Sequence, residues 1–315
     1  MQKNKAAHRA ICSDIVFTIT YEKSPSFIIN KYKLGRFGTG ILYLNPYECM
    51  FLYTKGKIVP ENTSLNNTGN LLERLGSDEN FLDEFIVYEI LKSHGLYVKF
   101  EGSSLYYRRT PRDDFKGPVR VIREDHTMDF SVMFNNGSCI YAALDDDNDV
   151  TVFISEPWNE TGENDFVIER GKNIRNLFRT PIAETSEVPE WFGNYIGGVK
   201  FLNQYEAAIL SENGPDRKTD QEIVQKVYND LISRKFIVKT GFKYGSNFRI
   251  YSRTIEEHAD FLVHVLDGPE EWYKISRGIR VAQGVKKEMI FAGKIGDRLE
   301  YIKLKRVRDP FSADF

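Results

Sequence analysis

The feature that most constrains this chain of 315 residues is an internal repeat, because a duplicated sequence predicts a duplicated fold. The segment Leu44-Asn-Pro-Tyr-Glu48 returns 158 residues later as Leu202-Asn-Gln-Tyr-Glu206. Farther along, Val87-Tyr-Glu-Ile-Leu91 returns 140 residues later as Val227-Tyr-Asn-Asp-Leu231. We therefore expect two copies of one folding unit in tandem.

Three side chains that can carry protons follow one another in the second copy. Tyr251 closes the run Phe248-Arg-Ile-Tyr251, whose alternating aromatic and β-branched residues predict a strand. His258 lies in the charged connector that leads to a second apolar strand, and loops at strand ends often carry catalytic residues. Lys287 falls within Ile275–Met289, where the spacing of apolar residues predicts an amphipathic helix.

These residue types suit cleavage of RNA without a metal. The ribose 2′-hydroxyl attacks its own phosphate when one group removes its proton and another protonates the departing 5′-oxygen. A tyrosine and a histidine can divide these two roles. A tyrosine acts as a base when a nearby cation favours its phenolate, and Lys287 is the candidate cation. The same ammonium can stabilise the charge on the phosphoryl oxygens in the transition state.

The second copy also contains an ordered series of motifs, which are Val227-Tyr-x-x-Leu231, Val238–Gly245, Phe248–Tyr251, His258, Leu262–His264 and Arg280–Lys287. Over roughly residues 220–308, this series resembles the archaeal tRNA-splicing endonucleases. The resemblance implies cleavage of precursor tRNA at bulge-helix-bulge junctions, leaving a 2′,3′-cyclic phosphate and a 5′-hydroxyl, with no cofactor and no metal. It assigns the base, the acid and the transition-state stabiliser to Tyr251, His258 and Lys287, with Lys286 as the neighbouring alternative to Lys287.

The resemblance further implies two side chains that hold a bulged base between them. They correspond to Arg280 and Arg306, and a guanidinium group stacks well on a base. Arg280 precedes Lys287 by seven residues, so we expect both cations on one face of the predicted helix. Arg306 alternates with Ile302 and Leu304 along the final strand, so it is expected on their face.

The first copy is expected to be inactive. Tyr107 and His126 align loosely with Tyr251 and His258, but nothing in the first copy answers the predicted helix Ile275–Met289 or its lysine. From Asp129 to Phe134 the sequence passes through Asn-Asn-Gly directly to the next strand. We therefore predict one active site per chain.

The two-repeat class of the family implies an α/β fold class with mixed α/β and α+β units. Each copy would combine a small N-terminal α+β subdomain with a nuclease-like α/β domain built on a mixed sheet, and the first copy would be degenerate. The expected boundaries are 1–160 for the inactive copy, divided into 1–75 and 76–160, and 161–315 for the catalytic copy, divided into 161–217 and 218–315.

An acidic run, Asp145-Asp-Asp-Asn-Asp149, places four carboxylates in one predicted turn. From the sequence alone, a solvated hairpin tip is the ordinary interpretation. The family resemblance implies instead a homodimer, in which Asp145, Asp146, Asp147 and Asp149 form an acidic loop that enters a basic pocket of the partner subunit.

Composition limits the binding partners and the cellular location that can be expected. The net charge of −2 gives no sign of nucleic-acid binding, but Tyr273–Arg308 holds eleven Lys and Arg against three Asp and Glu, so a basic surface would be local. Cys12, Cys49 and Cys139 are scattered, which suggests neither zinc nor disulfides. The chain has no membrane-length apolar run and no signal sequence, so we predict a cytoplasmic protein without a membrane partner.

Two other functions stay open at this stage. A metal-dependent nuclease of the restriction type needs clustered carboxylates for Mg²⁺, usually with Glu-x-Lys, and that tripeptide does not occur in the sequence. A noncatalytic RNA-binding or assembly subunit would not need the complete set of three residues. His264 alternates with Leu262 and Leu266 in an apolar strand, which predicts a core histidine outside the site.

Overall fold

The computed structural model forms two compact units. It describes residues 8–13, 16–20, 28–38, 41–60, 67–76, 79–169, 174–184, 188–211, 219–308 and 311. Unit 1 comprises Met1–Arg123, Cys139–Val152 and Val307–Phe315, and unit 2 comprises Glu124–Ser138 and Phe153–Arg306. Residues 124–138 of the first copy thus group with the second. The predicted domain boundaries stay predictions, and the one at residues 217 and 218 lies outside the described residues.

Unit 1 begins with a small α+β subdomain. Its sheet has the order β3-β4-β2-β1-β5, formed by Arg36–Gly38, Ile41–Leu44, Val16–Thr20, His8–Ser13 and Ile58–Pro60. A π-helix (Ile28–Tyr32) and helices α1 (Pro46–Thr54) and α2 (Thr68–Leu75) accompany these strands. The rest of unit 1 contains α3 (Phe81–Ser93), β6 (Tyr97–Glu101), β7 (Ser104–Arg108), β8 (Lys116–Arg123) and β10 (Cys139–Leu144), and β11 (Val150–Pro157) starts there.

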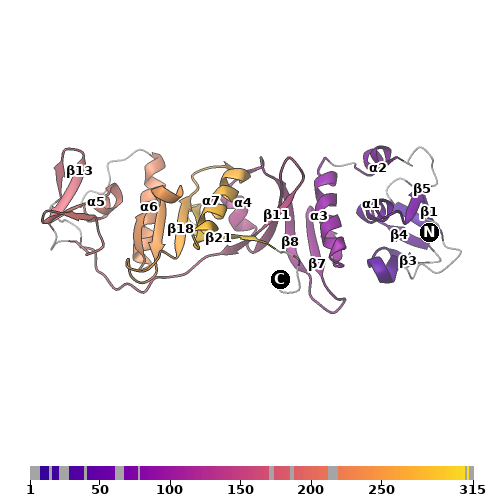
Figure 1. Ribbon diagram of the computed structural model, residues 1–315, viewed down its shortest axis with the longest axis horizontal. Helices are drawn as coiled ribbons and strands as arrows, with labels where there is room; N and C mark the ends of the chain where they lie inside the picture. Colours follow the sequence, from indigo (N-terminus) through magenta and orange to yellow (C-terminus); the bar gives the residue numbers. More distant parts are fainter. Residues whose placement is uncertain are drawn as a thin grey trace. The chain divides into compact units, whose positions relative to one another are not determined.

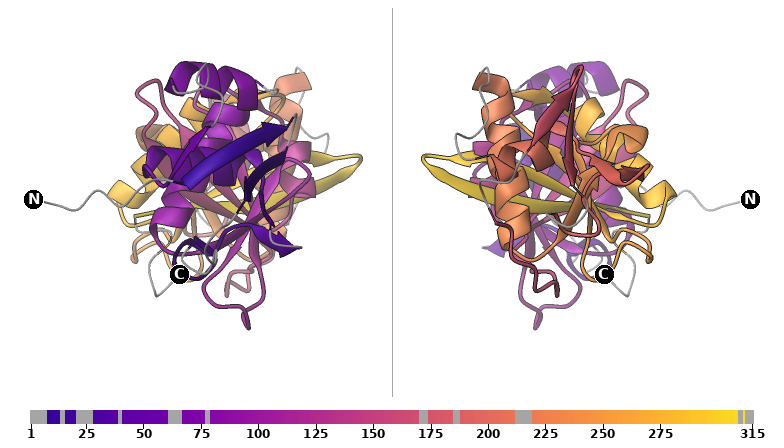
Figure 2. Two further views of the ribbon diagram at one scale, coloured as in Figure 1. Left: turned by 90° about the vertical axis from the view of Figure 1, so that its right-hand side faces the viewer. Right: turned by 90° about the vertical axis from the view of Figure 1, so that its left-hand side faces the viewer.

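Unit 2 contains a second small sheet and a larger one. The small sheet has the order β12-β13-β15-β14, formed by Arg175–Leu177, Thr180–Glu184, Val199–Phe201 and Asn194–Ile196, and is followed by α5 (Gln204–Leu210). The larger part contains α6 (Thr219–Ser233), β16 (Ile237–Thr240), the 3₁₀ helix η4 (Phe242–Tyr244), β17 (Phe248–Tyr251), β18 (Phe261–Val265), β19 (Glu270–Glu271), α7 (Trp272–Gly284), β20 (Glu288–Ile295) and β21 (Arg298–Val307). The antiparallel β20–β21 hairpin is drawn in yellow in Figure 2.

The same strand order occurs in both units. In unit 1 the order is β6-β7-β8-β10-β11, and in unit 2 it is β16-β17-β18-β20-β21. In unit 1 the pairs β6–β7 and β7–β8 are antiparallel, and in unit 2 so are β16–β17 and β17–β18. The next pairs, β8–β10 and β18–β20, are parallel. A parallel pair needs a crossover connection, and in unit 2 the helix α7 lies in that connection. The predicted α/β fold class with a mixed sheet is confirmed.

The repeated motif around Asn45 and Asn203 is a helix start. Each asparagine caps a helix and accepts a hydrogen bond from the backbone N–H of a glutamate three residues later, at 2.9 Å in both copies. The carboxylates of Glu48 and Glu206 accept in return from the N–H groups of the asparagines, also at 2.9 Å. This reciprocal capping box satisfies N–H groups that a helix cannot pair internally, so it explains why this part of the repeat is preserved.

One strand of unit 2, β20, is covered by helices from both copies. The helix α7 packs against β20, and so does α4 (Phe130–Asn135), which belongs to the first copy in sequence (Figure 1). A Cβ atom at Gly293 of β20 would lie 2.3 Å from the Phe130 ring, so only glycine lets this ring approach the strand. The short strand β9 (Thr127–Met128) pairs with β19 in the same unit.

Candidate active site

Tyr251, His258 and Lys287 meet around one residue, Ala259. Tyr251 ends β17 and forms a buried cluster with Ile237 and Ala259. His258 directly precedes Ala259 and is exposed. The ammonium of Lys287 donates a hydrogen bond to the carbonyl oxygen of Ala259 at 2.5 Å. The structure thus places Tyr251 and Lys287 at Ala259, the residue that directly follows His258.

Asp260 fastens the loop that carries His258. Its carboxylate accepts a hydrogen bond from the N–H of Ser252 at 2.8 Å, and its own N–H donates to the carbonyl of Ile250 at 3.0 Å. Its carbonyl accepts from the N–H of Glu288 at 3.1 Å. Asp260 therefore ties the loop to β17 and to the start of β20. Sequence reasoning missed this positioning residue, because its partners are known only from the fold.

The chain turns sharply between α7 and β20, and this turn separates the two neighbouring lysines. The helix ends at Gly284, and Lys286 has a left-handed backbone with φ of 56°. Lys286 is exposed, whereas Lys287 is buried, with 8% of its surface accessible. The amine that reaches the His258 loop is therefore that of Lys287.

The prediction of a helix through Met289 is wrong at its C-terminal end. Glu288 and Met289 already belong to β20, where Met289 is buried, so its apolar character reflects the sheet core rather than helical periodicity. The prediction that Arg280 and Lys287 share one helical face is wrong for the same reason, because Lys287 lies beyond the helix.

The ammonium of Lys287 retains donors for a ligand. In the described part of the chain, its hydrogen-bond partner is the Ala259 carbonyl, and no carboxylate lies within ion-pair distance. An ammonium has three N–H donors, so two remain after this bond. A partly desolvated cation with unused donors is suited to bind a phosphoryl oxygen.

Arg280 and Arg306 are both exposed, on segments that touch. The side-chain amide of Gln283, one helical turn after Arg280, donates to the carbonyl of Arg306 at 2.8 Å. This bond holds the last turn of α7 beside the end of β21. Ile302 and Leu304 of that strand are buried, so the strand leaves the core as it reaches Arg306.

The acidic turn between β10 and β11 uses its four aspartates differently. The Asp145 carboxylate accepts hydrogen bonds from the N–H groups of Asp147 and Asp149, at 3.1 and 2.9 Å, so it shapes the turn itself. Asp146, Asp147 and Asp149 are exposed. Arg123 donates to the Asp145 carbonyl at 3.3 Å and lies 3.9 Å from the Asp146 carboxylate.

The alignment of Tyr107 with Tyr251 is wrong by one residue. Tyr251 pairs with Ile237 across β16 and β17, and the corresponding pair across β6 and β7 is Arg108 with Tyr97. Tyr107 instead takes the place of Ile250 and is buried in the core. Sheet register decides this difference, because neighbouring strand residues point to opposite faces.

The alignment of His126 with His258 is wrong as well. His258 precedes β18, whereas His126 follows β8, the corresponding strand of the first copy. The loop that does correspond, residues 109–115, contains no histidine. His126 is exposed, and its carbonyl accepts a hydrogen bond from the N–H of Trp272.

The first copy does contain a counterpart of α7, which the sequence did not predict. The helix α4 has six residues against thirteen in α7, and Asp129 caps it by accepting from the N–H of Ser131 at 2.7 Å. Gly137 and Ser138 follow α4, where Lys286 and Lys287 follow α7. The absence of the lysine from this position agrees with the prediction of one site per chain.

His264 is not the core histidine that its alternation with leucines predicted. Leu262 and Leu266 are buried, but the side chain of His264 is 31% exposed and lies 3.2 Å from the Glu270 carboxylate. Because His264 is partly exposed and contacts the charged Glu270, it lies at the edge of the sheet core.

Neither a metal centre nor a membrane segment stands out in the described ranges. No three His, Cys, Asp or Glu side chains cluster there in a way that could hold a metal ion. No helix in these ranges is long and apolar enough to span a membrane.

Similar proteins come from several organisms. Residues 222–301 match the family described as "tRNA intron endonuclease, catalytic C-terminal domain". A tRNA-splicing endonuclease of Thermoplasma volcanium is 32% identical over 299 residues, which cover 95% of this chain and 98% of the relative. One of Picrophilus torridus is 33% identical over 300 residues, covering 93% and 95%. One of Methanosarcina barkeri is 25% identical over 334 residues, covering 88% and 94%.

A duplicated mixed α/β sheet, together with these relatives, defines the class as endonucleases of RNA processing. More particularly, the chain belongs to the tRNA-splicing endonuclease family.

Proposed function

We propose that this protein removes introns from precursor tRNA by cutting bulge-helix-bulge junctions without a metal. The 2′-oxygen forms a bond to phosphorus while the bond from phosphorus to the 5′-oxygen breaks. The products are a 2′,3′-cyclic phosphate and a 5′-hydroxyl. The observation that supports the proposal is that Tyr251 packs against Ala259 and Lys287 donates a hydrogen bond to its carbonyl, while His258 directly precedes it in the chain.

Each of the three side chains has a distinct role in this proposal. Tyr251 accepts the proton of the 2′-hydroxyl, and His258, which is exposed to an incoming substrate, donates a proton to the departing 5′-oxygen. Lys287 stabilises the negative charge on the phosphoryl oxygens with the donors that Ala259 leaves unused. Arg280 and Arg306 hold a bulged base between them.

The first experiment is cleavage of a bulge-helix-bulge RNA in excess EDTA by the wild type and by His258→Ala, with analysis of the product ends. We expect cyclic phosphate ends from the wild type and a rate lower by ~10²–10⁴-fold in the variant. Cutting that EDTA abolishes, or 5′-phosphate ends, would point to a metal-dependent nuclease instead.

The two adjacent lysines provide a matched pair of variants. Lys287→Ala removes the buried amine and should lower the cleavage rate by ~10²–10³-fold, while Lys286→Ala changes an exposed side chain and should change the rate little. RNA affinity is measured alongside. If Lys287→Ala bound RNA normally and cleaved it at the wild-type rate, the chain would be better described as a noncatalytic RNA-binding subunit.

We also propose that the protein acts as a homodimer held by the acidic turn. Asp146, Asp147 and Asp149 are exposed, so their three carboxylates are accessible to a basic surface of the partner. Replacing all three by lysine should give monomers in sedimentation equilibrium. Asp145→Asn, which alters only the carboxylate that shapes the turn, should keep the dimer. A triple variant that still sediments as a dimer would contradict this assembly.

A further inference from the structure

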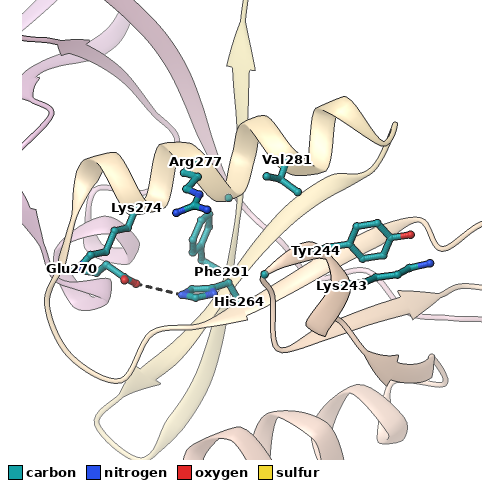
Figure 3. Close-up of a pocket in the computed structure, with 10 residues that line it drawn as sticks. Lys243, Tyr244, His264, Glu270, Lys274, Arg277, Val281 and Phe291 are labelled. Atoms are coloured by element: carbon teal, nitrogen blue, oxygen red, sulfur yellow. Dashed lines mark hydrogen bonds and ion pairs between the residues drawn. The ribbon is translucent and has the colours of Figure 1, made fainter.

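A pocket of about 490 Å³ lies beside α7, and its residues are separate from the three proposed catalytic residues. Figure 3 shows its walls, which come from η4, β18, β19, α7 and β20. The side chains that matter here are Lys243, Tyr244, His264, Glu270, Arg277 and Phe291. We call this site the α7 pocket. Its volume is typical of sites for small ligands.

Arg277 is the arginine among the lining residues of the α7 pocket, and its guanidinium group is available to a ligand. In the described part of the chain, no carboxylate lies within ion-pair distance of it, whereas Lys274 lies 2.8 Å from Glu271. In Figure 3 the guanidinium of Arg277 points into the pocket, near the Phe291 ring. A planar cation beside an aromatic ring favours a flat π-system as ligand.

A second aromatic group in the lining comes from another element, and in Figure 3 its side chain extends away from Arg277. Tyr244 belongs to η4, and the Lys243 ammonium lies 4.9 Å from the centre of its ring. The hydrogen bond from Lys243 lowers the pKa of Tyr244, and the charges of Lys287 and Arg249 contribute further lowering.

The α7 pocket also borders the helix face that carries Arg280. Its lining residues on α7 recur at spacings of three, four and seven, so they form one stripe. Arg277 lies at one edge of that stripe, and Arg280, three residues later, lies roughly 60° farther around the helix axis. A chain bound at Arg280 can thus reach the α7 pocket with its next nucleotides.

We propose that the α7 pocket binds one unpaired nucleotide of the RNA substrate, with its base against Arg277 and its phosphate near Lys243. This proposal rests on the proposed function, since it adds a subsite to the same RNA-cleaving site. Proteins recognise single-stranded RNA by stacking splayed bases on aromatic rings and guanidinium planes. The His264–Glu270 pair adds hydrogen-bonding groups for a base edge.

The test compares Arg277→Ala and Arg277→Lys with Arg298→Ala. Arg298 is equally an exposed arginine, but it lies at the β20–β21 turn and does not line the pocket. The probe is a bulge-helix-bulge RNA carrying 2-aminopurine at one unpaired position at a time. We expect wild type to change the fluorescence at one position, and Arg277→Ala to lose that change and to bind RNA ~5–100-fold more weakly. Arg277→Lys should restore the affinity only partly, because it keeps the charge without the plane.

Several outcomes would overturn the proposal. Wild-type fluorescence and affinity in Arg277→Ala, with normal cleavage, would remove the nucleotide subsite and leave the proposed function intact. Dissociation of a dimer by Arg277→Ala, with unchanged RNA affinity, would assign the pocket to a protein partner instead. Failure of the wild type to cut the RNA at all would overturn the proposed function itself.

Discussion

The two copies of the sheet share a strand order and yet differ wherever the proposed site needs a particular side chain. At the end of the second sheet strand, Tyr251 of the second copy corresponds to Arg108 of the first. Before the strand that follows the helix, Lys287 corresponds to Ser138. The loop between β17 and β18 contains His258, whereas the corresponding loop of the first copy, residues 109–115, contains no histidine. The two copies thus share their strand order but not the side chains of the proposed site.

The difference between the copies follows from burial. Val87 and Val227 are both fully buried at matching helix positions, and so are Leu91 and Leu231. Shortening a buried leucine to alanine costs about 2–5 kcal/mol, so these positions resist change. Substitution of an exposed loop residue, such as His258, costs much less, usually within about 0.5 kcal/mol. A copy that no longer cuts RNA can therefore lose its site and keep its fold.

The largest expected effect comes from removing one tyrosine hydroxyl from each copy, Tyr251 at the proposed site and Tyr107 in the core of unit 1. Tyr251→Phe should slow cleavage of a bulge-helix-bulge RNA by ~10²–10⁴-fold, because the proposed base is lost while the ring still packs. Tyr107→Phe should leave the single-turnover rate unchanged, because Tyr107 lies in the core of unit 1. Equal rates in both variants would exclude Tyr251 as the base.

A second comparison concerns two lysines at matching positions of the sheet. Lys239 lies 3.0 Å from the Glu206 carboxylate, and these side chains are 12% and 1% exposed. Lys239→Ala leaves a buried carboxylate without its partner, which costs about 3–5 kcal/mol of unfolding free energy. The matched variant Lys99→Ala loses an exposed pair with Glu101, worth about 0–1 kcal/mol, and cation–π contacts with the Tyr106 and Phe115 rings, worth about 0.5–1 kcal/mol at an exposed site. Urea unfolding of both variants measures the loss of unfolding free energy in each. Equal losses would contradict the expectation that the buried pair contributes more.

The core tyrosine of the first copy should also affect alkaline stability. Burial raises the pKa of Tyr107 to about 12, whereas an unfolded tyrosine titrates near ~10. Between about pH 10 and 12 the unfolded chain releases a proton that the folded chain keeps, so stability falls as the pH rises. Tyr107→Phe removes this contribution and should make the fall in the urea midpoint shallower.

The exposed Tyr195→Phe serves as the control for that measurement. At neutral pH, Tyr107→Phe should be neutral or stabilising by up to about 1 kcal/mol, because the Tyr107 hydroxyl is buried and has no hydrogen-bond partner within the described residues. A marked loss of stability at neutral pH would show that this hydroxyl is paired.

The smallest expected effect tests what the copies have in common. Asn45→Ala and Asn203→Ala each remove one helix cap of the same geometry. Each should cost about 1 kcal/mol of unfolding free energy, with little change in cleavage. A much larger loss in one variant would show that the two capping boxes are not equivalent.

Sequence reasoning succeeded where local patterns carry the information. The repeat and the fold class were both readable from short motifs. It failed at the end of α7, where Met289 continued the apolar spacing of a helix although it belongs to a strand. It also failed for Tyr107, because the β6–β7 and β16–β17 connections differ in length and the sequence alone does not show which residue lies opposite Tyr97.

By itself, the sequence determined the duplication and the motifs that nominate the three proposed catalytic side chains, because each motif consists of residues close together along the chain. Only the tertiary structure decided that Lys287 rather than Lys286 reaches Ala259, and that Arg108 stands where the first copy would need a tyrosine. It alone revealed the Asp260 contacts and the α7 pocket. These features depend on register and on contacts between distant segments, which a linear pattern does not contain.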